Sequence, residues 1–466
     1  MLTDTLASVF EEPACPTNRA KSAAEKKKGC SVKALTPGAA AGGCAFDGAK
    51  IALQPIVDAI HLVHAPIACE GNGWDNRHAF SSGPQLYRLG VTTDLTDLDV
   101  IHGGEQKLYK AIRQVIERHS PAAVFVYQTC VPALAGDDVE AVCKAAALKF
   151  GTPVIPVNAP GMVGTKNLGN RLGGETLLKH VIGTMEPEVS TDADINIIGD
   201  YNLAGELWQV KPLLEAIGLR VQACITGDAR YRDVAGAHRA RVNMMVCSQA
   251  MINVARTMEE RWGIPWFEGS FYGIADTTNA IVTMARLCVE RGADPALLTR
   301  AEAVTAEGAA RAWRRLGPYL PRLTGKKALV YTGGHKSWSM VSAVQELGME
   351  VVKTSVRKAT AEDKERVIDL VGSDAMVDDI PAKEMFRMLS TGEADILMSG
   401  GRSQFVALKA KAPWIDVNQE RHFAYAGYDG IVEFAHRVDL SIANPVWQAV
   451  RSPAPWDADW SDEGEA

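Results

Sequence analysis

Three of the nine cysteines stand where a thiolate could bind iron. Cys44, Cys69 and Cys130 each lie among glycine or proline residues, in GGCAFDG, PIACEGN and QTCVPALAG. Cys69 and Cys130 directly follow apolar strand-like runs, and parallel sheets bind ligands beyond the carboxyl ends of their strands. Soft thiolates hold iron–sulfur clusters, and small neighbours let backbone N–H groups approach the cluster. The spacing is not a local CxxC motif, so three unrelated loop cysteines remain the alternative.

A four-iron cluster normally takes four thiolates, so this trio would leave it one ligand short. The fourth would have to come from elsewhere, such as a second chain. Cys247 is a separate candidate because it closes the strand-like VNMMVC and opens the helix-like SQAMINVARTMEERWG. A helix N-terminus lowers the pKa of a thiol and stabilises its thiolate. A core cysteine at a strand–helix junction is an equal alternative for this position.

The other five cysteines are expected to bind nothing. Cys143 and Cys288 fall on apolar helical stripes, and Cys224 lies inside the strand-like VQACI. Buried free cysteines of this kind usually act as small apolar side chains. Cys15 and Cys30 lie in a segment rich in Pro, Gly, Ala and Lys, where nothing would fix them as ligands.

Two glycine-rich turns could bind an anion. Gly333, Gly334 and Lys336 stand in TGGHKSW, between a strand-like and a helix-like run. Such a turn presents backbone N–H groups at a helix start, which suits an anion. Arg402, in SGGRSQ, stands in the equivalent loop of the next unit. A Gly-Gly pair is more often only a tight turn, and that remains the alternative.

The elements that must position these residues alternate between strands and helices. The runs HLVHAPIA, AAVFVYQ and PVIPVN read as buried strands, separated by the amphipathic EQKLYKAIRQVIERH and DDVEAVCKAAALKF. Alternation of this kind is typical of a parallel sheet covered by helices. Residues 194–225 and 327–354 repeat the pattern about one domain length apart. The sequence therefore predicts an α/β fold of three Rossmann-like doubly wound domains with mostly parallel sheets.

The domain boundaries follow from this repeat. The first domain carries the three clustered cysteines, the second carries Cys247, and the helical stretch 276–316 is expected to bridge the second and third. We predict a mobile N-terminal extension over residues 1–40 and α/β domains over residues 41–190, 191–318 and 319–450. An acidic tail is predicted over residues 451–466.

Composition excludes several classes of protein. The chain of 466 residues has 49 Lys and Arg against 56 Asp and Glu, and this acidic balance disfavours a nucleic-acid binder. It has no run of about 18 apolar residues that would predict a membrane span. The first residues lack a basic stretch followed by an apolar one, so no secretory signal is expected. The expected compartment is the cytoplasm, where thiols stay reduced.

Long specific stretches give the chain a family resemblance. Over about 41–450 it resembles the nitrogenase component 1 superfamily. The matching stretches include GCAFDGAKIALQPI, HLVHAPIAC with WDNR, VFVYQTCVPALAGDD, IIGDYNLAGELWQVKPLLE and MINVARTMEERWGIPWFEGSFYG. Within that superfamily the resemblance points to the α-like subunits of the scaffold that matures the iron–molybdenum cofactor.

The resemblance implies two cluster sites. By position, Cys44, Cys69 and Cys130 match cysteines that hold a [4Fe–4S] cluster shared with a partner subunit, NifN, which supplies the fourth thiolate. Cys247 matches the cysteine that ligates the terminal iron of the cofactor in the catalytic relative. Arg77, in WDNR, falls where that relative has an arginine facing the cofactor.

Departures from the catalytic relative are equally informative. Asn418 falls where the relative has the histidine that ligates molybdenum. Asn170 falls where it has a second histidine near the substrate, and Lys166 replaces a nearby glutamine. An amide is a much poorer metal ligand than an imidazole. The resemblance therefore implies a site that holds a precursor loosely and releases it, rather than one that reduces dinitrogen.

The implied function is that of a carrier scaffold rather than an enzyme, with residual reductase activity left open. A heterotetramer with NifN would receive an iron–sulfur precursor from NifB. Molybdenum and homocitrate would arrive through the Fe protein NifH, and the product would pass to apo-nitrogenase. The alternative is the catalytic α subunit of a nitrogenase or a related two-component reductase. A dinucleotide-dependent oxidoreductase is disfavoured, because no G-x-G-x-x-G opens a strand–helix unit with an acidic residue about 20 positions on.

Overall fold

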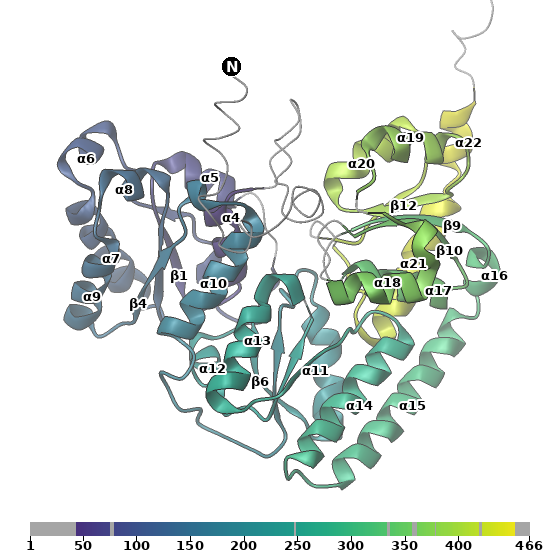
Figure 1. The fold of residues 1–466 in the computed structure, drawn as a ribbon, viewed down its shortest axis with the longest axis horizontal. Helices are drawn as coiled ribbons and strands as arrows, with labels where there is room; N and C mark the ends of the chain where they lie inside the picture. Colours follow the sequence, from purple (N-terminus) through teal and green to yellow (C-terminus); the bar gives the residue numbers. More distant parts are fainter. Residues whose placement is uncertain are drawn as a thin grey trace, which may run out of the picture.

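Three parallel sheets, each covered by helices, make up the computed structural model of the chain (Figure 1). The structure describes residues 43–74, 79–246, 248–332, 336–356, 361–377, 379–418 and 422–452. Every pairing between its named strands is parallel. The predicted fold class is confirmed. The predicted N-terminal extension and nearly all of the predicted acidic tail lie outside the described residues.

The first sheet has the strand order β2-β1-β3-β4. Its strands are β1 (Ile60–His64), β2 (Val91–Thr92), β3 (Val124–Gln128) and β4 (Val154–Asn158). Successive side chains of a strand point to opposite faces of the sheet. Accordingly, Ile60 and Leu62 pack under α7 (Glu105–His119) and α9 (Val139–Phe150), whereas Val63 joins the core under α4 (Ala45–Leu53) and α10 (Lys166–His180).

The second sheet has the order β6-β5-β7-β8. Its strands are β5 (Asp194–Ile198), β6 (Arg220–Ile225), β7 (Val242–Met245) and β8 (Trp266–Glu268), and its core receives residues of α11 (Glu206–Ile217) and α14 (Ile274–Glu290). Helix α13 (Ser248–Trp262) follows β7 and packs its apolar side into the core beside the first sheet. The stretch expected to bridge the last two domains is two helices, α14 and α15 (Ala296–Leu316), and α15 packs against both α11 and α21 (Gly427–Ile442).

The third sheet has the order β11-β10-β9-β12-β13. Its strands are β9 (Lys327–Tyr331), β10 (Glu350–Ser355), β11 (Met376–Val377), β12 (Ile396–Ser399) and β13 (Trp414–Asp416). Helices α17 (Lys336–Glu346) and α21 contribute to its core. The three sheets fall inside the three predicted domains, while the boundaries at 190 and 318 stay a prediction. Among the described residues, no helix is both long and apolar enough to cross a bilayer.

Helix α10 joins the first sheet to the second through contacts that only glycine permits. A Cβ on Gly169 would lie 1.9 Å from the carbonyl oxygen of Ala45, so the backbones of α10 and α4 touch where they cross. A Cβ on Gly174 would lie 2.8 Å from Cγ2 of Val254 on α13. Figure 1 shows α10 lying between α4 and α13. Helix α10 therefore fixes α4, which follows Cys44, against α13, which follows position 247.

Candidate metal centre

Each of the three clustered cysteines stands at the start of a helix. Cys44 is the residue before α4, Cys69 lies in the first turn of α5 (Ile67–Trp74), and Cys130 opens α8 (Cys130–Ala135). The last residues of β1 and β3, His64 and Gln128, are paired across the sheet. The structure therefore places Cys69 and Cys130 beyond the carboxyl ends of two neighbouring strands.

Two of the three thiols, those of Cys44 and Cys130, lie beside Gly161, which opens the short turn η2 (Gly161–Val163) after β4. A Cβ on this glycine would lie 2.9 Å from Cys44 Sγ and 3.2 Å from Cys130 Sγ. Burial raises the pKa of the Cys69 thiol, and the nearness of Cys130 and Cys44 raises it further, which places Cys69 close to the other two. All three thiols are free and half-buried. Any side chain at position 161 would enter the space beside the sulfurs.

The chemistry of the three thiols fits an iron–sulfur cluster. Among the residues that the structure describes, no group of three His, Cys, Asp or Glu side chains is close enough to hold one metal ion. Thiolates that share one ion lie within about 4.6 Å of each other, because each metal–sulfur bond is about 2.3 Å long. Thiolates of a four-iron cluster bind different irons and stand further apart. The three half-buried thiols are donors of the kind that a four-iron cluster takes.

An exposed apolar rim stands close in sequence to Cys69, Cys130 and Gly161. It consists of Ile67, Leu134, Met162 and Val163, which are between 46% and 74% exposed. Ile67 stands two residues before Cys69, and Met162 and Val163 directly follow the glycine between the sulfurs. Large apolar side chains gathered on an exposed surface mark interaction sites more often than chance exposure.

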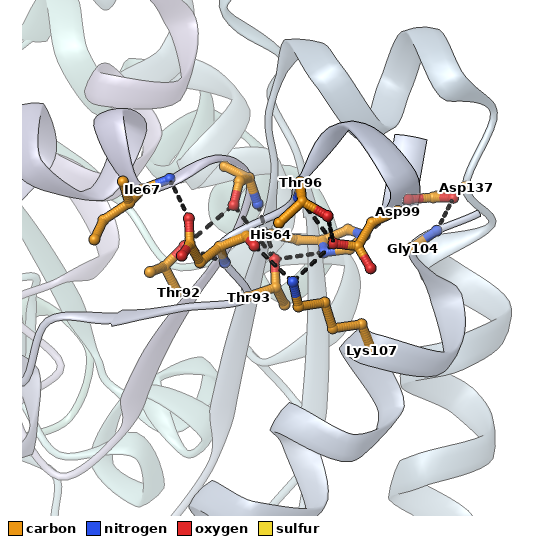
Figure 2. A network of polar contacts seen from close by, with 11 residues as sticks. His64, Ile67, Thr92, Thr93, Thr96, Asp99, Gly104, Lys107 and Asp137 are labelled. Carbon is orange, nitrogen blue, oxygen red and sulfur yellow. Dashed lines mark hydrogen bonds and ion pairs between the residues drawn. The ribbon is translucent and has the colours of Figure 1, made fainter. Parts of the chain in front are cut away.

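A buried polar network holds the loops beside the thiols (Figure 2). His64, fully buried at the end of β1, has Nδ1 3.0 Å from Thr93 Oγ1 and Nε2 3.0 Å from Asp137 Oδ2. The backbone N–H of Gly104 donates to Asp137 Oδ1 at 2.9 Å. Burial lowers the pKa of His64 and Asp137 opposes that shift, so the imidazole is neutral at pH 7. The network connects the end of β1 with the loop that follows α8. The chain continues from the end of β1 to Cys69.

Lys166 and Asn170 stand on the same helix, close to the thiols. Lys166 opens α10 and is half-buried, and the residue before it pairs with Cys44 in an isolated bridge. Asn170 follows one turn later and is 8% exposed, and its Oδ1 has no hydrogen-bond partner. A buried amide oxygen without a partner is costly in a closed core, so it suggests a ligand or water at this place.

Asn418 and Arg402 lie at the carboxyl edge of the third sheet. Asn418 follows β13, is half-buried and donates its backbone N–H to Asp416 Oδ1 at 2.6 Å. Arg402 lies in η4 (Gly401–Ser403) after β12 and is exposed. The two loops are adjacent, because a Cβ on Gly400 would lie 3.2 Å from Asn418 Nδ2.

Several predicted site residues cannot be placed. Lys336 opens α17, but its side chain is not described. The flanks of position 247 are described: β7 ends at Met245, and α13 begins at Ser248, as expected for a strand–helix junction. The predicted residues that lie outside the described part of the chain are Arg77, Cys247, Gly333 and Gly334.

The three cysteines predicted to fill the core do so. Cys143, Cys224 and Cys288 are buried, the first on the core-facing side of α9 and the other two in the core of the second sheet. Burial raises the pKa of each thiol to about 12. That prediction is confirmed.

Sequence reasoning missed two features of the site. Gly161 stands in APGMVG after β4, the strand beside β3 in the sheet. The rule that ligands gather beyond neighbouring strands would have pointed to it. The second is an ion pair between Lys50 and Glu70, two charged residues in segments that otherwise read as apolar. The spacing of residues in the sequence does not predict a contact between α4 and α5.

Comparison with known proteins agrees with this arrangement. The profile of a family described as nitrogenase component 1 type oxidoreductase matches residues 44–442. The chain is 61% identical over 458 residues to the nitrogenase iron-molybdenum cofactor biosynthesis protein NifE of Mesorhizobium japonicum, covering 98% of this chain and 92% of the relative. It is 59% identical to the protein of the same name from Rhodobacter capsulatus, with coverages of 98% and 96%.

A solved structure is also similar. Nitrogenase Cp1 at pH 5 superposes with a TM-score of 0.81 at 28% identity, over 90% of this chain and 92% of that one. The family resemblance read from the sequence is confirmed.

Proposed function

This chain belongs to the nitrogenase component 1 type oxidoreductase family, and we propose that it is the α-like subunit of the scaffold on which the iron–molybdenum cofactor matures. It binds an iron–sulfur precursor, hosts its maturation with molybdenum and homocitrate, and passes it to apo-nitrogenase. The observation that carries the proposal is the 61% identity, over 98% of the chain, to a protein named for biosynthesis of this cofactor. Identity to nitrogenase Cp1 is 28%.

Cys44, Cys69 and Cys130 hold a [4Fe–4S] cluster at the boundary with NifN, which contributes the fourth thiolate. The cluster supplies one-electron redox chemistry when bound. Gly161 supports this assignment, since it leaves space beside two of the sulfurs. The apolar rim supports a partner at this face, because a bound subunit would take those side chains out of water.

The cargo lies between α10 and the carboxyl edges of the second and third sheets. Cys247 anchors one iron of the precursor, and cationic side chains and backbone N–H groups face the anionic homocitrate. The unpartnered Oδ1 of Asn170 supports a polar ligand beside α10. The residues proposed to face the cargo are Cys247, Arg77, Lys166, Asn170, Gly333, Gly334, Lys336, Arg402 and Asn418.

Amides at positions 170 and 418 suit a carrier. An amide does not titrate near neutral pH and coordinates metal poorly, so neither residue can shuttle protons or fix molybdenum firmly. The complex is proposed to be a cytoplasmic heterotetramer with NifN that takes precursor from NifB and works with NifH. The alternative, a catalytic α subunit, keeps some support from the fold shared with nitrogenase Cp1.

Two assays on the anaerobically purified complex separate these functions. The complex, supplied with molybdate, homocitrate and the Fe protein, should activate cofactor-free nitrogenase. The complex with the Fe protein alone should not sustain acetylene reduction. Sustained turnover without added nitrogenase would favour the catalytic alternative.

Position 247 can be tested in the same preparation. Cys247→Ala should lower the iron retained as precursor while leaving the interfacial four-iron EPR signal in place. Cys288→Ala, which removes a core thiol of the same domain, is the control. Unchanged iron content and unchanged activation of nitrogenase in Cys247→Ala would show that the precursor is anchored elsewhere.

A further inference from the structure

A buried ion pair lies directly behind the thiol site. Lys50 stands on α4, the helix that begins after Cys44, and Glu70 directly follows Cys69 on α5. Lys50 Nζ donates a hydrogen bond to Glu70 Oε2, and the two side chains are 2% and 6% exposed. The pair therefore connects a helix that carries one thiol to a helix that carries another.

Stability alone does not account for this pair. Both side chains are almost completely buried, so their charged forms lose hydration. Apolar side chains of similar volume often replace buried ion pairs with no loss of stability. The other carboxylate oxygen, Glu70 Oε1, has no hydrogen-bond partner, which adds to the cost. A contact maintained at such cost suggests a need for a defined direction and distance.

The described part of α5 buries few of its side chains in the core. Within Ile67–Asn72, the part of α5 whose burial is described, Glu70 is the one buried residue. Cys69 is half-buried and the remaining four residues are exposed. Helices usually owe their position to an apolar face packed against the core. The described part of α5 contacts α4 through the Glu70 carboxylate, and the backbone N–H of Ile67 donates to Asp94 Oδ1 at 3.3 Å at the start of the helix.

Helix α4, in contrast, is fixed independently. All nine of its residues are buried, and its backbone touches α10 at Gly48 and Gly169. Cys44 is thus placed by rigid packing. The position of Cys69 depends on the contact between α5 and α4.

We propose that Lys50 and Glu70 are positioning residues of the thiol site, whose ion pair sets the distance between Cys44 Sγ and Cys69 Sγ. The inference rests on the proposed function, since it assigns these residues to the cluster held by those thiols. Ion pairs are directional, so they can fix the register of two helices where apolar contacts would let them slide.

Three variants of the full complex with its partner test the role. Glu70→Gln keeps shape and removes the charge. The double variant Lys50→Met with Glu70→Leu replaces the pair by apolar side chains, which should preserve folding. Glu117→Gln is the matched control, because Glu117 pairs with Arg113 on the exposed face of α7 in the same domain.

The readout is the four-iron EPR signal per chain, with thermal unfolding followed by circular dichroism. Glu70→Gln should lose about tenfold in signal intensity, as is usual when outer partners of metal ligands are removed. The double variant should unfold near the temperature of the unsubstituted complex and still show a weakened or displaced signal. Glu117→Gln should match the unsubstituted complex.

Full signal in a stably folded double variant would overturn the positioning role, because burial alone would then place the thiols. Full signal in Glu70→Gln would do the same, and if that variant does not fold, the double variant decides. Absence of a four-iron signal from the unsubstituted complex would instead contradict the proposed function. The two failures are therefore distinguishable.

Discussion

The cysteines of this chain fall into two regions with opposite properties. Cys44, Cys69 and Cys130 lie at helix starts and are half-buried, with Gly161 beside the sulfurs of Cys44 and Cys130. Cys143 and Cys224, like Cys288, lie inside helices or strands and are buried among apolar side chains. Residue type is the same in both regions, so position relative to the ends of elements separates a candidate ligand from core packing.

The difference has a chemical basis. Only the thiolate binds metal, and burial among apolar groups disfavours the charged form. Burial raises the pKa of the Cys224 thiol to about 12, so almost none of it is ionised at neutral pH. Cys69 is less buried, and the hydroxyl of Thr129 lowers the pKa of its thiol against the larger effect of burial. The half-buried thiols of the first region are therefore more accessible to iron than the buried thiols of the second.

The largest effect should come from removing one thiol of the site. Cys69→Ala or Cys130→Ala should abolish the interfacial four-iron EPR signal and weaken association with NifN, because three remaining thiolates cannot complete the cluster. Cys143→Ala is the control. It should keep the signal and cost only about 1 kcal/mol in the free energy of unfolding, the usual cost of a small core cavity. An intact signal in Cys130→Ala would remove the distinction between the two regions.

The next effect should come from filling the space beside the sulfurs. Gly161→Ala would bring a methyl group to 2.9 Å from Cys44 Sγ, closer than two such atoms can pack. The four-iron signal should fall about tenfold, like the effect of disturbing the surroundings of other metal ligands. Gly71→Ala, two residues after Cys69, is the control, since its Cβ would meet nothing within 4 Å. Equal signals in the two variants would contradict the geometry of the site.

A smaller effect concerns the pH dependence of thiol labelling. Iodoacetamide reacts with thiolates, so cluster-free complex should be labelled at Cys69 and not at Cys224 in the folded state. Because burial raises the pKa of Cys69 above its ordinary value, its labelling rate should still rise between pH 8 and pH 9. Mass spectrometry of tryptic peptides measures both rates. Comparable labelling of Cys224 would show that the core region is open to solvent.

The smallest effect should follow from loss of a hydroxyl group. Thr129 is buried, and its single hydroxyl proton can be donated either to the carbonyl oxygen of His64, 3.2 Å from Oγ1, or to the Cys69 thiolate. Hydrogen bonds to cluster sulfurs raise the reduction potential. Thr129→Val should therefore shift the midpoint of an EPR-monitored redox titration to a more negative value, and Thr129→Ser should not. Identical midpoints in all three proteins would exclude this contact.

Local patterns predicted the fold well. The helix read in EQKLYKAIRQVIERH is α7, residues 105–119, because its apolar residues repeat with helical period. The stretch 276–316 was read as one helical region and is two helices, which Pro295, the N-cap of α15, separates. The longer strands of each sheet, such as β3, β5 and β9, follow from their continuous apolar runs, whereas short strands such as β2, β8 and β11 were not predicted.

The site was harder to predict from the sequence than the fold, because it is made of contacts between residues far apart in the chain. The cysteine spacing left unrelated loop cysteines as an alternative, and the family resemblance supplied the grouping. Gly161 and the Lys50–Glu70 pair come from separate segments, and their contacts depend on how α4 packs against α5 and η2. A lone glycine or lysine carries no signal of such a partner.

The central claim is that Cys44, Cys69 and Cys130 hold one iron–sulfur cluster. The most direct test is an iron-edge anomalous difference map from crystals of the anaerobically purified complex. The account predicts a compact group of four iron peaks beside Gly161, within bonding distance of the three Sγ atoms. Iron density elsewhere in the chain, with these thiols free or joined in a disulfide, would contradict it.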